Sequence, residues 1–262
     1  MQGLQASIAG QKIVVGFGAD FLQFLQAEIP GMRHFPTYAT TNIDLHADDS
    51  DLFLWFKSEQ RGDLFHMRRH LEKLLTPVFS VTHQIPAFRY QTGHDLTGYE
   101  DGTENPIDDA AIACAFLESD QASVHGSSYL AVQQWRHNFQ VFDAMNSTQQ
   151  DNMVGRRLRD NEELDDAPES AHVKRTAQES FSPEAFILRR SMPWAENNHA
   201  GLYFTAFANS FDPFEAQLKR MLGMEDGIVD DLFKISTPMH SKYFWCPPMQ
   251  ENRINLSFLQ FS

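Results

Sequence analysis

Apolar residues recur along the chain with two different spacings, which predict a mixture of helices and strands. Between Arg61 and Leu75 the apolar positions are 64, 67, 71, 74 and 75, the spacing of a helix with one buried face. Short runs of β-branched and aromatic residues predict strands instead, as at Lys12 to Val15 and Asp51 to Lys57. Proline marks the ends of helices, since Pro30 and Pro77 each follow a predicted helix.

The remaining predicted elements divide between helices and strands. Further helices are expected over Ala19 to Ile29, Asp108 to Leu117, Asn138 to Met145, Ser147 to Val154 and Pro213 to Leu222. Further strands are expected over Val78 to His83, Phe88 to Gln91, Ser127 to Arg136, Phe186 to Arg190, Leu202 to Ala208 and Lys242 to Trp245. Because several strands follow one another directly, the pattern favours an α+β fold over a regular parallel α/β fold.

The composition and net charge limit the classes of molecule that the protein is expected to bind. The 262 residues, 42% of them hydrophobic, are enough for one large domain or two small ones. The net charge of -14 disfavours nucleic acid and anionic lipid as partners. No apolar run approaches the length of a membrane span, so we expect no membrane association. The two cysteines, Cys114 and Cys246, form no metal or redox motif, and a reduced cytoplasmic location is expected.

The run Gly98-Tyr-Glu-Asp-Gly-Thr-Glu-Asn-Pro106 carries the clearest candidate chemistry. Its glycines and its turn-forming pairs predict a rigid loop that presents one carboxylate, Asp101. The same run is also compatible with an ordinary hairpin turn and a solvated aspartate. The motif alone leaves both interpretations open.

Two further positions stand out by context. His172 lies in a polar stretch, Glu169-Ser-Ala-His-Val-Lys-Arg175, where it is a candidate ligand or a solvent-facing histidine. Strand alternation would place Arg189 and Ser191 on one face, where they could bind a polar ligand or protect a sheet edge. His66 and His70 have metal-ligand spacing, but Met67 stands between them and a surface helix is the simpler interpretation.

These segments occur together in an order that resembles the dye-decolorising peroxidases, above all the bacterial members. The resemblance runs from about Val14 to Pro247. It is carried by VVGFGADF at 14–21, GYEDGTENP at 98–106, YLAVQQWRHN at 129–138, VGR at 154–156, ELDD at 163–166, SAHVKR at 170–175, RRSMPW at 189–194 and GLYFTAF at 201–207.

The resemblance implies two ferredoxin-like halves with antiparallel sheets, 1–95 and 96–262. It implies one haem b in the C-terminal half, and the lack of a Cys-x-x-Cys-His motif argues against covalent attachment. His172 is implied as the iron ligand, supported by an acid at or near Asp230, with Asp231 and Asp226 as neighbouring alternatives. The haem-contacting positions that follow from the matched segments are His172, Gly102, Thr103, Glu104, Arg156, Arg189, Ser191 and Phe204.

The activity implied is the reduction of hydrogen peroxide coupled to oxidation of a dye or phenolic donor. Asp101 would shuttle the proton and Arg189 would stabilise the developing negative charge. The aromatic residues Trp135, Trp194, Tyr203, Tyr243 and Trp245 are potential electron relays, although ordinary core packing is the favoured interpretation. Two other functions stay open, namely a haem-handling protein that needs only His172, and a ferredoxin-like binding module without cofactor.

The chain departs from the family at its beginning. Relatives carry an additional strand and helix before the region that matches Val14, where only 13 residues stand here. Either the first half lacks these elements or a partner chain covers its edge. We therefore expect a homo-oligomer.

Overall fold

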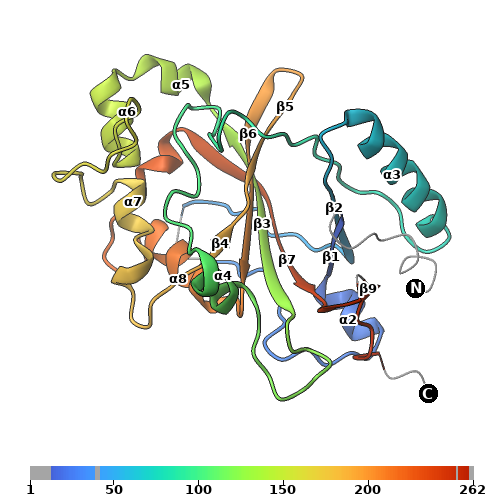
Figure 1. Ribbon diagram of the computed structural model, residues 1–262. Coiled ribbons are helices and arrows are strands. Elements are labelled where there is room, and N and C mark those ends of the chain that lie inside the picture. The colour runs from blue at the N-terminus through green and yellow to red at the C-terminus, as the bar shows by residue number, and fades with distance from the viewer. Residues whose placement is uncertain (1–12, 39–41, 252, 260–262) are drawn as a thin grey trace.

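A computed structural model describes residues 13–38, 42–251 and 253–259. Its centre is a seven-stranded antiparallel sheet in the order β2-β1-β7-β3-β6-β4, with β5 also paired to β6 (Figure 1). A separate two-stranded sheet joins β8 and β9. The strands are β1 (Ile13–Phe17), β2 (Leu52–Phe56), β3 (Ser128–His137), β4 (Leu188–Arg189), β5 (Met192–Glu196), β6 (His199–Ala208), β7 (Ser236–Cys246), β8 (Met249–Gln250) and β9 (Arg253–Ile254).

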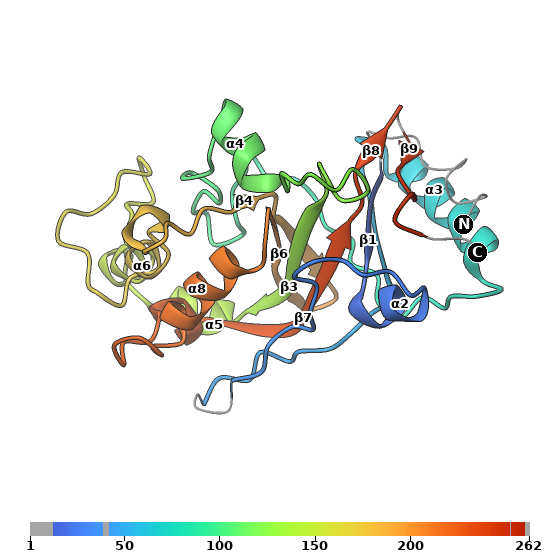
Figure 2. The same cartoon turned by 90° about the horizontal axis from the view of Figure 1, so that it is seen from below.

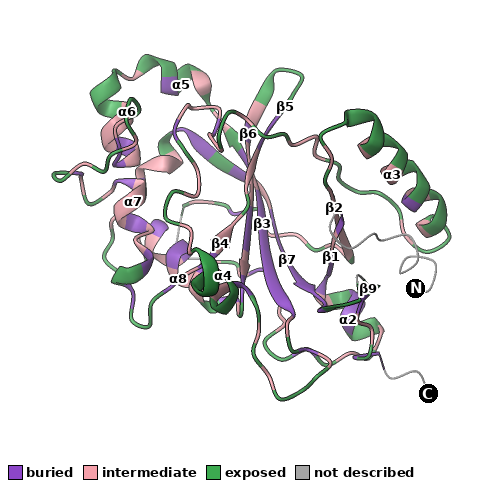
Figure 3. Ribbon diagram, viewed as in Figure 1, coloured by how far each residue is buried: buried purple, intermediate pink, exposed green. Residues whose placement is uncertain are grey.

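The long strands β3, β6 and β7 form the middle of the sheet because both of their faces are covered. Leu130 and Val132 pack in an apolar cluster on one face, while Tyr129 and Ala131 belong to the main core on the other. This alternation follows directly from the two-residue period of a strand. Figure 3 shows β3 and β7 buried over most of their length.

The helices gather at two ends of the sheet. Figures 1 and 2 show α5 to α8 on one side, and α2 and α3 on the other. The helices are α2 (Ala19–Phe24), α3 (Arg61–Leu75), α4 (Asp108–Ala115), α5 (Phe139–Ala144), α6 (Ser147–Val154), α7 (His172–Arg175) and α8 (Asp212–Met221), with short 3-10 turns η1 (Gln178–Ser180) and η2 (Asp231–Lys234). None of the helices in the described part of the chain is both long enough and apolar enough to cross a lipid bilayer.

Several local expectations are confirmed and others are wrong. Helix α3 has the predicted bounds. The expected strands at 78–83 and 88–91 do not form, because Val78, Val81 and Phe88 are exposed and the segment contributes only one isolated bridge, Ala87 to Trp194. Strand β5 was not predicted; it pairs with β6 along its length and also makes the isolated bridge to Ala87.

The division into two halves does not appear as two separate sheets within the described residues. Strands β1 and β2 of the N-terminal half continue the sheet of the C-terminal half, through the pairing of Phe17 with Trp245. Phe17 and Trp245 are both fully buried in one common core. Of the aromatic residues named as potential electron relays, Trp135, Trp194, Tyr243 and Trp245 are buried and Tyr203 is partly buried, and their role as relays stays a prediction.

Candidate functional site

The imidazole of His172 is oriented by a buried carboxylate. His172 opens the short helix α7, and its Nδ1 lies 2.8 Å from Oδ2 of Asp230. The Asp230 side chain is fully buried, and its second oxygen accepts the backbone N–H of Leu232 at 2.8 Å. Among the described residues no hydrogen bond occupies Nε2 of His172, whose side chain is 28% exposed. An imidazole that donates from Nδ1 to a carboxylate presents Nε2 as a metal ligand.

The two neighbouring acids have other partners. Asp226 binds the guanidinium of Arg175 through two contacts of 2.8 Å, and these hydrogen bonds lower the pKa of the Asp226 carboxyl. Asp231 pairs with Lys234 at 2.7 Å. Asp230 is therefore the acid of this group that contacts His172.

The segment that leads into the Asp101 loop is anchored at Asp95. This buried carboxylate accepts hydrogen bonds from the backbone and hydroxyl of Thr97, at 2.9 and 2.6 Å, and lies 3.0 Å from Nε2 of His137 at the end of β3. Burial alone would raise the pKa of Asp95, but the contacts with His137 and Thr97 hold it below its usual value. Asp101 itself is half-buried, and its backbone N–H donates to Gly93 at 3.0 Å.

Asn105 fastens the Asp101 loop to strand β4. Its Oδ1 accepts the backbone N–H of Arg189 at 2.7 Å, and its Nδ2 donates to the Arg189 carbonyl at 3.0 Å. The side-chain amide thus completes the backbone hydrogen bonds of Arg189 as a neighbouring strand would. Gln178 makes a similar connection, because it donates to the Glu104 carbonyl and accepts from the N–H of Ile187.

Arg189 and Ser191 do not continue one strand, so the expected alternation does not extend from one to the other. Strand β4 ends with Arg189 opposite Ala206, and β5 begins with Met192 opposite Tyr203. The hydroxyl of Ser191, which lies between the two strands, accepts a hydrogen bond from the backbone N–H of Thr205 at 3.4 Å. The Arg189 Nε atom is buried and has no hydrogen-bond partner among the described residues.

Arg189 and Asp101 do not form an ion pair within the described part of the chain. Asn105, four residues after Asp101, binds the backbone of Arg189, and the Nε atom of Arg189 is left without a partner among the described residues. A buried guanidinium nitrogen without a partner favours an anionic or polar ligand at that point.

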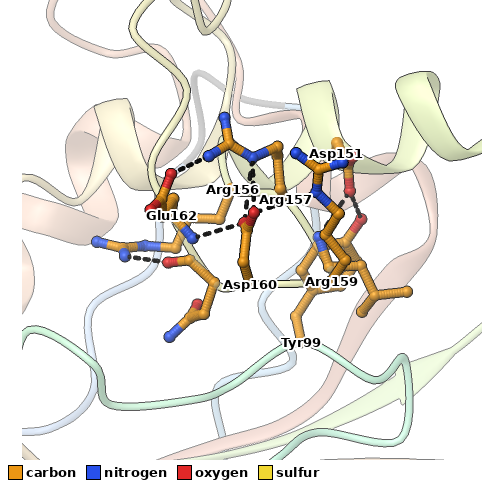
Figure 4. A network of polar contacts seen from close by, with 9 residues as sticks. Tyr99, Asp151, Arg156, Arg157, Arg159, Asp160 and Glu162 are labelled. Atoms are coloured by element: carbon orange, nitrogen blue, oxygen red, sulfur yellow. Dashed lines mark hydrogen bonds and ion pairs between the residues drawn. The ribbon is translucent and has the colours of Figure 1, made fainter.

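Arg156 is held by acids of two loops. Its guanidinium contacts Glu104 at 2.6 Å and Glu163 at 3.2 Å. Thr103 accepts a hydrogen bond from Asn161, while the turn at Gly102 has a positive φ of 77°. Figure 4 shows the adjoining network, in which the Tyr99 hydroxyl donates to Asp151 of α6 and Arg157 contacts Asp160. These contacts fix the connection 155–163 against the Asp101 loop.

The side chains at this place fit a haem. His172 offers a free imidazole nitrogen for iron, which suits nitrogen ligands. Arg189 offers an unpaired guanidinium nitrogen, and Phe204 a half-buried ring on the same face. A hollow of about 710 Å³ lies beside α2, but none of the predicted site residues lines it. Its lining includes Arg33, which is paired with Asp212 and Glu215, and the exposed His34, so its chemistry differs from that of the His172 and Arg189 positions.

Sequence reasoning missed the residues that hold the site together. From the sequence, Asn105 was recognised only as part of a turn-forming run. No local signal links it to the backbone of Arg189, which is 84 residues away in the sequence. Asp95, Gln178 and Tyr99 were likewise not singled out. A buried polar side chain of this kind is recognisable only once its distant partner is known.

The comparisons with known proteins agree with the resemblance. The family model described as Dyp-type peroxidase, C-terminal, matches residues 92–251. A dye-decolorizing peroxidase of Mycolicibacterium paratuberculosis is 29% identical over 207 residues, covering 77% of this chain and 58% of that protein. One of Rhodococcus erythropolis is 29% identical over 262 residues, covering 94% of this chain and 76% of that protein.

Solved structures show the same fold. A putative dyp-type peroxidase of Shewanella oneidensis superposes with a TM-score of 0.85 at 26% identity, covering 95% of this chain and 81% of that chain. DyPB of Rhodococcus jostii superposes with a TM-score of 0.84 at 26% identity, covering 94% of this chain and 84% of that chain. The family model covers more than half of the sequence, and the chain belongs to the DyP-type peroxidase family.

Proposed function

We propose that this protein is a haem b peroxidase that reduces hydrogen peroxide and oxidises dyes or phenolic one-electron donors. The observation that carries the proposal is the contact of His172 with the buried carboxylate of Asp230. Family membership supports it, as do the Rhodococcus jostii DypB variants solved in complex with heme. The proposed haem lies in the half formed by 96–262, with 1–95 as a second ferredoxin-like half.

The carboxylate of Asp230 would act through the imidazole. With its proton on Nδ1 and directed at Asp230, His172 keeps its Nε2 lone pair for the iron. The ionised partner raises the basicity of that nitrogen, and haem iron so ligated supplies the redox chemistry that cleaves the peroxide bond. The N–H of Leu232 holds Asp230 in this orientation.

Asp101 and Arg189 would have different roles in the reaction with peroxide. Asp101 is proposed to take a proton from one peroxide oxygen and return it to the departing oxygen. Arg189 would stabilise negative charge on that departing oxygen, a role that fits its buried Nε atom, which has no hydrogen-bond partner among the described residues. Asn105 would hold the loop that carries Asp101 against the backbone of Arg189.

The other predicted contacts form the rim of the proposed site. Gly102, Thr103 and Glu104 belong to the Asp101 loop, Ser191 lies between β4 and β5, and Phe204 lies on β6. Arg156 is already neutralised by Glu104 and Glu163, so we propose that it positions the loop.

The test is the reaction of the full-length, haem-loaded protein with hydrogen peroxide, followed by stopped-flow absorption near the Soret band. The proposal predicts a fast spectral change that slows at least about 100-fold in Asp101→Asn and Arg189→Leu, the contribution expected of acid–base and charge-stabilising groups. Arg190→Leu is the matched control, because Arg190 follows directly and is exposed.

The alternative functions give different results in the same experiment. A haem-handling protein would bind haem through His172 but show no dependence of the peroxide reaction on Asp101 or Arg189. A cofactor-free module would show no Soret absorption at all. Equal rates in wild type, Asp101→Asn and Arg189→Leu would remove both residues from the mechanism.

A further inference from the structure

Two histidines far apart in the sequence meet at the edge of strand β7, outside the site described above. Nε2 of His83 and Nε2 of His240 lie 3.0 Å apart. His240 belongs to β7, whereas His83 lies in the irregular segment between α3 and α4. Asp48, on the connection before β2, completes a cluster whose candidate ligand atoms all lie within 4.8 Å of one another.

The arrangement of the two rings favours a shared ligand over an end-to-end hydrogen bond. The ring centroids are 4.0 Å apart, only 1.0 Å more than the two nitrogens, and the planes meet at 63°. The rings therefore meet in a T-shaped arrangement and not end to end, with their Nε2 atoms close together. Two nitrogens each about 2.0–2.1 Å from one cation are about 3 Å apart when the angle between them is close to a right angle.

Asp48 defines which nitrogen of His240 is free. Its Oδ2 lies 3.2 Å from Nδ1 of His240, so the proton of a neutral imidazole resides on Nδ1 and Nε2 keeps its lone pair. Lys242 lies 3.0 Å from the same oxygen and donates to Ser50 at 2.7 Å. The charge of Lys242 is thus matched by Asp48, and Asp48 serves as the outer partner of a histidine ligand.

The surroundings are open to a small cation. His83 is exposed, and the side chains of His240 and Asp48 are about one-third exposed, so water can complete the coordination. The net charge of -14 raises the local concentration of cations around the whole protein. Imidazole nitrogen suits zinc, copper and nickel better than the hard ions calcium and magnesium.

We propose that His83 and His240 bind one divalent transition-metal cation through their Nε2 atoms, with Asp48 as a positioning residue behind His240. Zn²⁺ and Cu²⁺ are the chemical class that this donor set fits. The site does not depend on haem and is distinct from the His172 centre.

The test is calorimetric titration of Zn²⁺ into the full-length, haem-loaded protein, together with electron paramagnetic resonance after one equivalent of Cu²⁺. The proposal predicts one tight site and coupling of copper to two nitrogens in the wild type. His83→Gln and His240→Gln should abolish that site, and Asp48→Asn should weaken it about 10–100-fold, as outer-shell changes do. His66→Gln, which removes an exposed imidazole from α3, should leave it unchanged.

The decisive variant is His83→Gln, because His83 is exposed and its replacement leaves the fold intact. Circular dichroism checks that His240→Gln is folded. If the wild type takes up no stoichiometric Zn²⁺, the histidines form a simple hydrogen-bonded pair and the proposal is wrong. Unchanged binding in His83→Gln would overturn it equally.

Discussion

Replacing Asn105 by alanine should loosen the connection between the Asp101 loop and strand β4. The substitution removes two hydrogen bonds to the backbone of Arg189, at 2.7 and 3.0 Å. Each is worth about 0.5–1.5 kcal/mol net, so the free energy of unfolding should fall by about 1–3 kcal/mol. For a chain of this size, each kcal/mol lowers the melting temperature by about 2–4 °C.

The assay is thermal unfolding of Asn105→Ala, compared with two further variants that show how much of the loss comes from the hydrogen bonds to Arg189. Asn105→Asp keeps the oxygen that accepts from Arg189 but loses the donor, so it should lose about half as much. Asn209→Ala removes a single exposed contact with the carbonyl of Ala113 and should lower the stability least. The peroxide reaction should slow in Asn105→Ala but not in Asn209→Ala. A melting temperature of Asn105→Ala equal to that of Asn209→Ala would refute the reasoning.

Three further predictions follow from individual contacts. Asp95→Asn should lower the free energy of unfolding by about 1–3 kcal/mol at pH 7. Because the pKa of Asp95 is lowered in the folded protein, its stabilisation is present above about pH 4 and disappears as the pH falls through the folded pKa. Denaturation curves of variant and wild type should therefore converge in acid, and a constant difference in stability would contradict this. Gly155→Ala should destabilise the protein by about 1–3 kcal/mol, since the φ of Gly155 is 90° and the new Cβ would lie 2.2 Å from the side chain of Val173, next to His172. The affinity for haem should fall as well, and an unchanged haem titration would count against this packing argument. Asp230→Asn should lower haem affinity or peroxide turnover about 10–100-fold, measured by haem titration and steady-state kinetics, whereas Asp231→Asn serves as the control and should leave both unchanged.

Sequence patterns predicted the elements whose cause is local. Helix α3 shows apolar residues at helical spacing, and its predicted bounds match the structure. Strand β3 was predicted from its apolar run and extends one residue further, to His137. The segments 78–83 and 88–91 carry similar apolar residues but form no strand, and the pairing near them is limited to the isolated bridge between Ala87 and Trp194 of β5. Strand formation depends on a partner, which a local pattern does not reveal.

The candidate site likewise contains features that the sequence predicted and features that it did not. Alternation predicted a common face for Arg189 and Ser191, but Ser191 lies between two strands and its hydroxyl accepts from the backbone N–H of Thr205. The contact between His172 and Asp230 spans 58 residues, and only the resemblance to known peroxidases pointed to it. Asn105 and Asp95 escaped notice because each binds a partner brought close by the fold. Cytoplasmic location and self-association stay predictions.

The central claim is that His172 binds the haem iron through Nε2. The most direct measurement is resonance Raman spectroscopy of the reduced, haem-loaded protein, in which an iron–imidazole stretching band reports this bond. The wild type should show the band, while His172→Ala reconstituted with haem should lack it until free imidazole is added. An unaltered band in His172→Ala would place the iron ligand elsewhere and contradict the account.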